Sequence, residues 1–225
     1  MHSNDQPFAD DSKVSFLSTV PAGRNAWRLA IAVVLVSTFV CAVTVPFVSV
    51  HLEKIPAFVP AYQSALAIND LITAILLFGL FKRVHSWALL FLASGYLFNS
   101  LIIVAHTLSF PGVFSPTGLL GAGDQTTAWL YVLWHAGFPL FVLAYAAMRL
   151  RENSGEVPLG KTTSVVLGST ILVICLVGGL TVLATAGMHF LHVIIQGSDY
   201  SLLVSKGVSP AILLLSFAAI VLLLW

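Results

Sequence analysis

The sequence predicts an all-α protein that crosses a membrane several times. Of its 225 residues, 58% are hydrophobic and only 8% are charged, whereas an ordinary soluble domain has about 25% charged residues. Several uncharged runs exceed about 18 residues, which is long enough for a helix to cross a bilayer. The alternating pattern of an outer-membrane barrel is missing. A formal net charge of +1 gives no indication of a nucleic-acid partner.

Six membrane spans follow one another along the chain. They are expected near residues 27–50, 61–81, 84–108, 127–149, 163–187 and 208–225. About 20 helical residues suffice to cross the hydrocarbon layer of a bilayer. Residues 1–26 are polar, and we expect them to form a cytoplasmic segment before a transmembrane domain at 27–225. Because the last span ends without a basic flank, the chain is expected to be truncated at its C-terminus.

The basic residues predict the orientation of these spans. Two of the ten Lys and Arg residues, Lys54 and Lys206, fall on one side of the membrane. The other eight fall on the opposite side: Lys13, Arg24, Arg28, Lys82, Arg83, Arg149, Arg151 and Lys161. The positive-inside rule places the side with eight charges, and with it the N-terminus, in the cytoplasm.

Proline and glycine residues predict the backbone conformation between and within the spans. Residues 109–126 hold two prolines and four glycines, which predicts an ordered series of turns with Asp124 or Thr126 capping the next span. Gly137 and Pro139, on either side of Phe138, predict a kink or a close helix approach inside the fourth span, and the Gly178–Gly179 pair predicts the same in the fifth.

Asp70 is the one formally charged residue placed deep inside a hydrophobic run. A carboxylate at the bilayer centre costs roughly 2.5–3.5 kcal/mol on insertion scales, so it should face the bundle and have a partner. One interpretation is a structural anchor paired with Asn99, His135 or a backbone group. The other is a group that titrates or binds a cation in a sensor or proton path. Asn69 could assist in either role.

Several histidines are expected in the same outer half of the bundle. His135 lies roughly 12 Å below the outer end of its span, close to the depth of Asp70. His106 lies at the outer end of its span, and His189 and His192 share a helical face if their segment is helical. These four imidazoles could ligate a transition metal or haem. Alternatively, they are interfacial residues bonded to water or to the loop.

Aromatic residues open the fourth span. Trp129, Tyr131 and Trp134 favour an anchoring belt at the membrane interface. They could instead line a ligand pocket together with Phe138 and Tyr96. No catalytic motif occurs in the sequence, which argues against an enzyme.

Long stretches of the chain resemble the fourth type of bacterial membrane-associated sensor (MASE) domain. The stretches that carry the resemblance are residues 56–79, 93–98, 105–112, 118–131 and 134–139. The matching polar and aromatic positions are Gln63, Asn69, Asp70, Tyr96, His106, Gln125, Trp129, His135 and Pro139.

The resemblance implies a sensory input module in the bacterial inner membrane. Such modules commonly precede GGDEF diguanylate cyclases and sometimes histidine kinases, so it also implies a cytoplasmic output domain and a homodimer formed through it. The candidate sensing residues are Asn69, Asp70, Tyr96, Asn99, Gln125, Trp129 and Trp134. Two alternatives stay open from the residues themselves: a haem- or metal-binding redox protein and a small transporter.

Overall fold

The computed structural model describes residues 23–47, 50, 55, 57–151, 159–196, 202 and 207–224. Within these ranges it contains helices and no strand, and five helices are long and apolar enough to cross a membrane. The predicted helical, polytopic fold class is confirmed. The chain divides into two compact units, Met1–Lys54 and Ile55–Trp225. Most of the predicted cytoplasmic segment, residues 1–22, lies outside the described residues.

The first unit contributes one apolar helix. α1 runs from Arg24 to Thr44 and continues as a 3₁₀ turn, Val45–Phe47. Neither segment has a buried residue. Pro46 lies inside this turn and cannot donate a backbone hydrogen bond, which is consistent with the end of the α-helix at this point.

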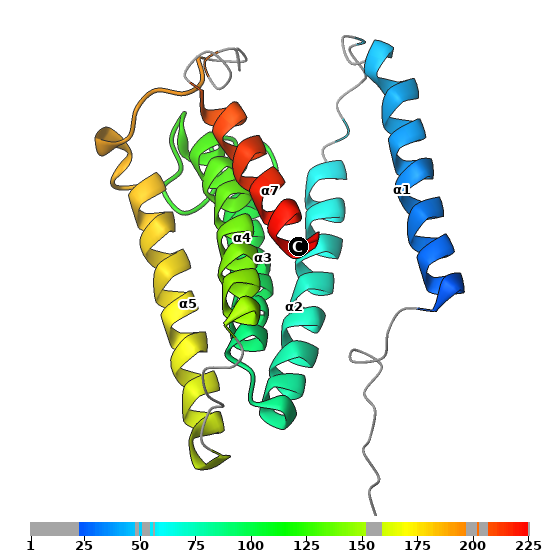
Figure 1. Cartoon of the computed structure of the whole chain (residues 1–225). Coiled ribbons are helices and arrows are strands. Elements are labelled where there is room, and N and C mark those ends of the chain that lie inside the picture. Colours follow the sequence, from blue (N-terminus) through cyan, green and yellow to red (C-terminus); the bar gives the residue numbers. More distant parts are fainter. Residues whose placement is uncertain are drawn as a thin grey trace, which may run out of the picture. The chain divides into compact units, whose positions relative to one another are not determined.

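The second unit is a bundle whose longest helices are α2 (Phe58–Val84), α3 (Trp87–Ser109), α4 (Thr126–Leu150), α5 (Thr162–Ala184) and α7 (Val208–Leu224). α3 contacts α2, α4 and α5, while α7 packs on α4 (Figure 1). Fourteen residues of α3 are buried, against five in α2. α3 is therefore the central helix, and its many Ala, Ser and Gly residues let its neighbours come close.

Only two residues connect α2 to α3, so these helices form an antiparallel hairpin. His85 takes the left-handed conformation at φ 58°, and Ser86 accepts a hydrogen bond from the Leu89 amide at 3.5 Å as the N-cap of α3. The basic residues Lys82 and Arg83 occupy the last turn of α2. There they offset the partial negative charge of the helix C-terminus.

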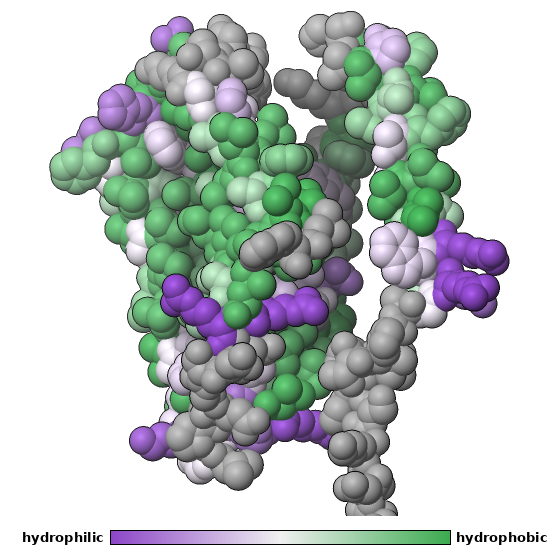
Figure 2. All heavy atoms as spheres, viewed as in Figure 1, coloured by the Kyte–Doolittle hydropathy of each residue, from purple (hydrophilic) through white to green (hydrophobic). Residues whose placement is uncertain are grey.

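Three more of the described basic residues lie at the same end of the bundle as this turn. Arg149 and Arg151 lie at the C-terminus of α4, and Lys161 precedes α5. The rest of the visible surface is mostly hydrophobic, with hydrophilic residues prominent in its lower part (Figure 2). A helical bundle with an apolar side surface and a basic end is suited to a bilayer.

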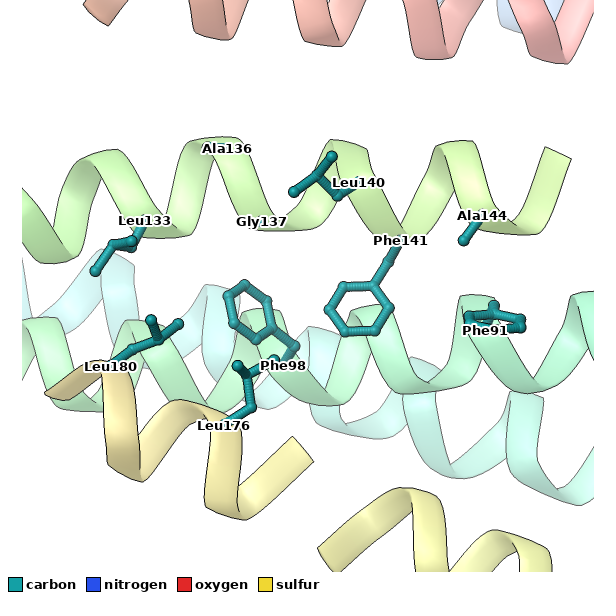
Figure 3. Close-up of a pocket in the computed structure, with 10 residues that line it drawn as sticks. All are labelled: Phe91, Phe98, Leu133, Ala136, Gly137, Leu140, Phe141, Ala144, Leu176 and Leu180. Carbon is teal, nitrogen blue, oxygen red and sulfur yellow. The ribbon is translucent and has the colours of Figure 1, made fainter. Parts of the chain in front are cut away.

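α3 and α4 approach each other through a reciprocal pair of glycine and phenylalanine contacts. A Cβ added at Gly95 would lie 2.7 Å from the Cβ of Phe141, and one added at Gly137 would overlap the ring of Phe98. The rings of Phe98 and Phe141 lie 5.4 Å apart, and both lie between the two helices in Figure 3. The close approach predicted at Gly137 is confirmed.

The fifth span differs from the expected one in two details. The helix ends at Ala184 rather than near 187, because Thr185 leaves the helical conformation at φ −105° and ψ −85°. A Cβ added at Gly178 or Gly179 would meet no atom within 4 Å, so these glycines mark no close approach among the described residues. Small size permits a close approach but does not require one.

We expect the Gly95→Ala variant to destabilise the bundle by about 1–3 kcal/mol, the usual cost of overpacking. The new methyl group would meet the Phe141 Cβ and force α3 and α4 apart. Thermal unfolding of the detergent-purified protein measures the effect. Gly178→Ala is the matched control, since its methyl group enters open space. Equal melting temperatures for the two variants would contradict this account of the interface.

Candidate functional site

One face of α2 is buried, and it carries the polar side chains of the candidate site. Gln63, Ala67, Asp70 and Ala74 are spaced by four, three and four residues, which places them on a single helical stripe. Gln63 is 1% exposed and Asp70 is 7% exposed. This stripe faces α3, so both polar groups must find partners on that helix.

Asp70 is paired with Asn99 of α3. The Nδ2 amide of Asn99 donates a hydrogen bond to Oδ2 of Asp70 at 2.6 Å. The carbonyl oxygen of the same amide, Oδ1, is buried and has no hydrogen-bond partner among the described residues. Asn99 is one of the three partners that the sequence allowed for Asp70. The Asp70–Asn99 pair therefore leaves one buried acceptor, Oδ1 of Asn99, without a hydrogen bond from the described residues.

A second contact lies one turn away along the hairpin. The hydroxyl of Ser100 donates to the backbone carbonyl of Ala67 at 2.8 Å. A side chain that bonds the backbone of the facing helix requires close packing, which Ala67 permits because it is small. This contact fixes the register between α2 and α3.

Gln63 forms the third contact with α3, and it joins three side chains. Its Oε1 accepts from the Thr107 hydroxyl at 2.5 Å, and its Nε2 lies 3.1 Å from Nδ1 of His106. Nε2 also donates to the hydroxyl oxygen of Tyr62 at 3.1 Å. Nδ1 of His106 also lies 3.2 Å from Oε1 of Gln63, so it accepts from the Gln63 amide in one tautomer and donates to Oε1 in the other. Nε2 of His106 makes no hydrogen bond to a described residue.

Side chains at the start of α4 form hydrogen bonds with the backbone of the chain that follows α5. Gln125 accepts from the amides of Ile194 and Ile195 at 2.9 and 3.1 Å, and its Nε2 donates to the Ile195 carbonyl at 2.7 Å. Trp129 donates to the carbonyl of His192 at 2.9 Å. The side chain of Thr126 does not cap α4. Its hydroxyl donates instead to the backbone carbonyl of Ala184, the last residue of α5, at 2.8 Å. We call Gln125, Thr126 and Trp129 the α4 clasp.

An aromatic group lies one turn further along α4. The ring of His135 stacks on that of Tyr131 at 3.8 Å, and its Nδ1 lies 2.8 Å from the Tyr131 carbonyl. Trp134 contacts the rings of both His106, at 6.0 Å, and His135, at 4.6 Å. His135 is therefore linked to His106 through an aromatic ring, and it makes no hydrogen bond to Asp70.

The structure does not assemble the four histidines into a metal site. His189 lies in a 3₁₀ turn, Met188–Phe190, and His192 follows it in non-helical chain, so the α-helix on which they would share one face is not formed there. Both are exposed, whereas His106 is buried against Gln63. Among the described residues no group of three His, Cys, Asp or Glu side chains is placed to hold a metal ion.

The remaining candidates occupy separate places. Asn69 is exposed, and its carbonyl accepts a hydrogen bond from Thr73 within α2. Tyr96 packs edge-on against Phe138 at 5.2 Å. The sequence analysis missed Thr107 and Ser100 as interhelical contacts, and it noted Gln63 only through the resemblance. A signal for Gln63 was present, since it lies two helical turns before Asp70 and shares its face.

Comparison with known proteins gives one family. Residues 53–225 match the family model of MASE4, a membrane-associated sensor, integral membrane domain. The match covers more than half of the 225 residues and includes all five helices of the second unit. No curated protein and no solved structure matches the chain.

We expect Gln125→Ala to release the chain between α5 and α7. It would leave the buried amides of Ile194 and Ile195 without partners, and each such group costs roughly 1–3 kcal/mol. Hydrogen exchange at these two amides should become at least about tenfold faster. Asp124→Ala, a change at the exposed neighbouring residue, is the control. Unchanged exchange in Gln125→Ala would show that the clasp does not hold this segment.

Proposed function

The chain belongs to the MASE4 family of membrane-associated sensors, and we propose that it is the input domain of a bacterial signalling protein with a cytoplasmic output domain. A membrane sensor domain is not itself catalytic. The output proposed is cyclic di-GMP synthesis or histidine kinase activity in a homodimer. The domain would lie in the bacterial inner membrane with its N-terminus in the cytoplasm.

The observation that carries this proposal is the partly satisfied polar interface between α2 and α3. Asp70 is buried and bonded to Asn99, whose carbonyl oxygen has no donor in the described part of the chain. Lipid offers no hydrogen bonds, so the pairing of these groups dominates the relative energies of different α2–α3 arrangements. Such an interface can give a sensor domain two arrangements of α2 and α3 that are similar in energy, as switching requires.

The distribution of charge supports the proposed direction of signalling. The basic ends of α2 and α4, with Arg83 and Arg149, would face the cytoplasm under the positive-inside rule. Gln63, His106 and the α4 clasp lie at the opposite ends of their helices. A stimulus received there would alter the α2–α3 contact and thereby bias the cytoplasmic ends.

We expect Asp70→Asn and Asn99→Leu to change the output of the intact signalling protein in opposite directions. The neutral amide at 70 removes the cost of burying a charge and favours the packed arrangement. Leu at 99 leaves the carboxylate buried without its partner and disfavours that arrangement. A shift of about 0.7 kcal/mol changes a two-state ratio by about threefold, which an assay of product or autophosphorylation per unit of membrane protein detects.

Asn69→Ala is the control for this experiment, because the side chain next to Asp70 is exposed. It should leave the output unchanged. If Asp70→Asn and Asn99→Leu also leave it unchanged at normal expression, the proposed role of the α2–α3 interface is wrong.

The proposed orientation predicts which added cysteines react with a membrane-impermeant maleimide. In a background with Cys41 and Cys175 replaced by Ser, Asp124→Cys should be labelled in intact spheroplasts. Lys161→Cys should be labelled only after the membrane is broken. Both positions are exposed. The reverse pattern would place the basic end outside and refute the orientation.

A further inference from the structure

A cavity of about 460 Å³ opens at the end of the bundle where α2, α4 and α7 begin and α3 ends. Its polar wall includes Gln63 and His106, which are 1% and 4% exposed. Tyr62, Tyr131 and Ser209 also line it. Its volume is within the range of small-molecule sites, about 300–1,000 Å³.

Several side chains that line this cavity can donate a hydrogen bond. Nδ1 of His106 contacts Gln63, and in the tautomer in which Nδ1 accepts, Nε2 carries a proton that it can donate to another partner. The hydroxyls of Tyr131 and Ser209 make no hydrogen bond to a described residue. Tyr62 accepts from Gln63 and can still donate its own proton. Such a wall suits a ligand that presents acceptor oxygens.

The other lining residues favour an uncharged compound with a flat apolar body. Among the described residues no Asp, Glu, Lys or Arg lines the cavity, so these residues offer a charged ligand no counter-ion. Phe110 packs against the His106 ring at 5.7 Å, and Tyr131 is fixed by stacking on His135. Aromatic faces of this kind favour a planar ring.

The rim of the cavity is accessible from the side of the bundle. Phe58, Tyr62 and Tyr131 are 62%, 40% and 45% exposed. In a membrane these apolar and amphipathic side chains lie at the depth where helices begin, close to the interface. A lipid-soluble molecule could enter there without crossing the polar end of the bundle.

We propose that this cavity binds a lipid-soluble quinone or a similar planar, uncharged ring compound with carbonyl oxygens. The carbonyls would accept hydrogen bonds from His106 Nε2 and the Tyr131 hydroxyl. The proposal deepens the proposed function and rests on it, because occupancy would act through Gln63, which bonds both His106 and Thr107 across the α2–α3 interface. The ligand would thus be the stimulus.

The test is binding of decylubiquinone to the purified chain in lipid nanodiscs, followed by quenching of tryptophan fluorescence. Trp134 contacts the His106 ring and is the expected reporter. Saturable quenching beyond that of soluble tryptophan in empty nanodiscs is expected. Tyr131→Phe, which removes one exposed hydroxyl, should raise the Kd about three- to tenfold, the value of one neutral hydrogen bond.

Two further variants test whether the loss of binding is specific to side chains that line the cavity. His106→Asn keeps a group near Nδ1 for Gln63 but deletes Nε2, and should weaken binding to a similar extent. Tyr145→Phe, also a loss of one hydroxyl on α4, lies outside this cavity and should leave the Kd unchanged. An equal Kd for Tyr131→Phe and the wild-type chain, or an equal loss in Tyr145→Phe, would overturn the proposal.

A competition experiment tests the chemical class. Dihexanoylglycerol offers ester carbonyls without a ring, and displacement as strong as that by the quinone would overturn the assignment of a planar ring. Binding is measured without an output domain, so its failure leaves the Asp70 and Asn99 experiment intact. Conversely, normal binding with no response of the output to those variants would refute the signalling role and leave the site standing.

Discussion

The buried carboxylate of Asp70 is the constraint on which the second unit depends. Lipid tails are as apolar as leucine, so helices in a bilayer gain little from hiding apolar surface from each other. A carboxylate, in contrast, is costly at membrane depth and must turn towards the bundle. Its bond to Asn99 therefore sets the rotation of α2 about its axis. Once that rotation is set, Ala67 and Gln63 face α3 as well.

A second requirement of the membrane explains the α4 clasp. Residues 192–195, which follow the 3₁₀ turn Met188–Phe190, are not helical, so their amides have no partners within a helix. Non-helical backbone near the membrane is stable only where protein groups satisfy it. Gln125 supplies both a donor and an acceptor to Ile195. One side chain can therefore replace part of the hydrogen bonding that a continued helix would have provided.

The sequence was sufficient for those properties that depend on position along a helix. Long apolar runs predicted the helical fold class, and the same spacing predicted a similar depth for Asp70 and Asn99, which form a hydrogen bond. Depth does not determine which way a side chain points, and for this reason Gln63 was not singled out from spacing. His189 and His192 would share a helical face only if the helix continued through them, but α5 ends at Ala184. The resemblance to MASE domains was confirmed because it rested on long stretches rather than single residues.

The short connection between α2 and α3 determines where their packing can change. His85 and Ser86 join the helices at the basic end, so that end cannot separate without breaking the turn and the Ser86 cap. Any change in the hairpin must therefore be largest at its open end, where Gln63 meets Thr107 and the cavity lies. Because α3 is in tight contact with α4 at Gly95, a displacement of α3 must move α4 with it. A displacement at the open end would then reach the basic end of the bundle through α4 rather than through the closed turn of the hairpin.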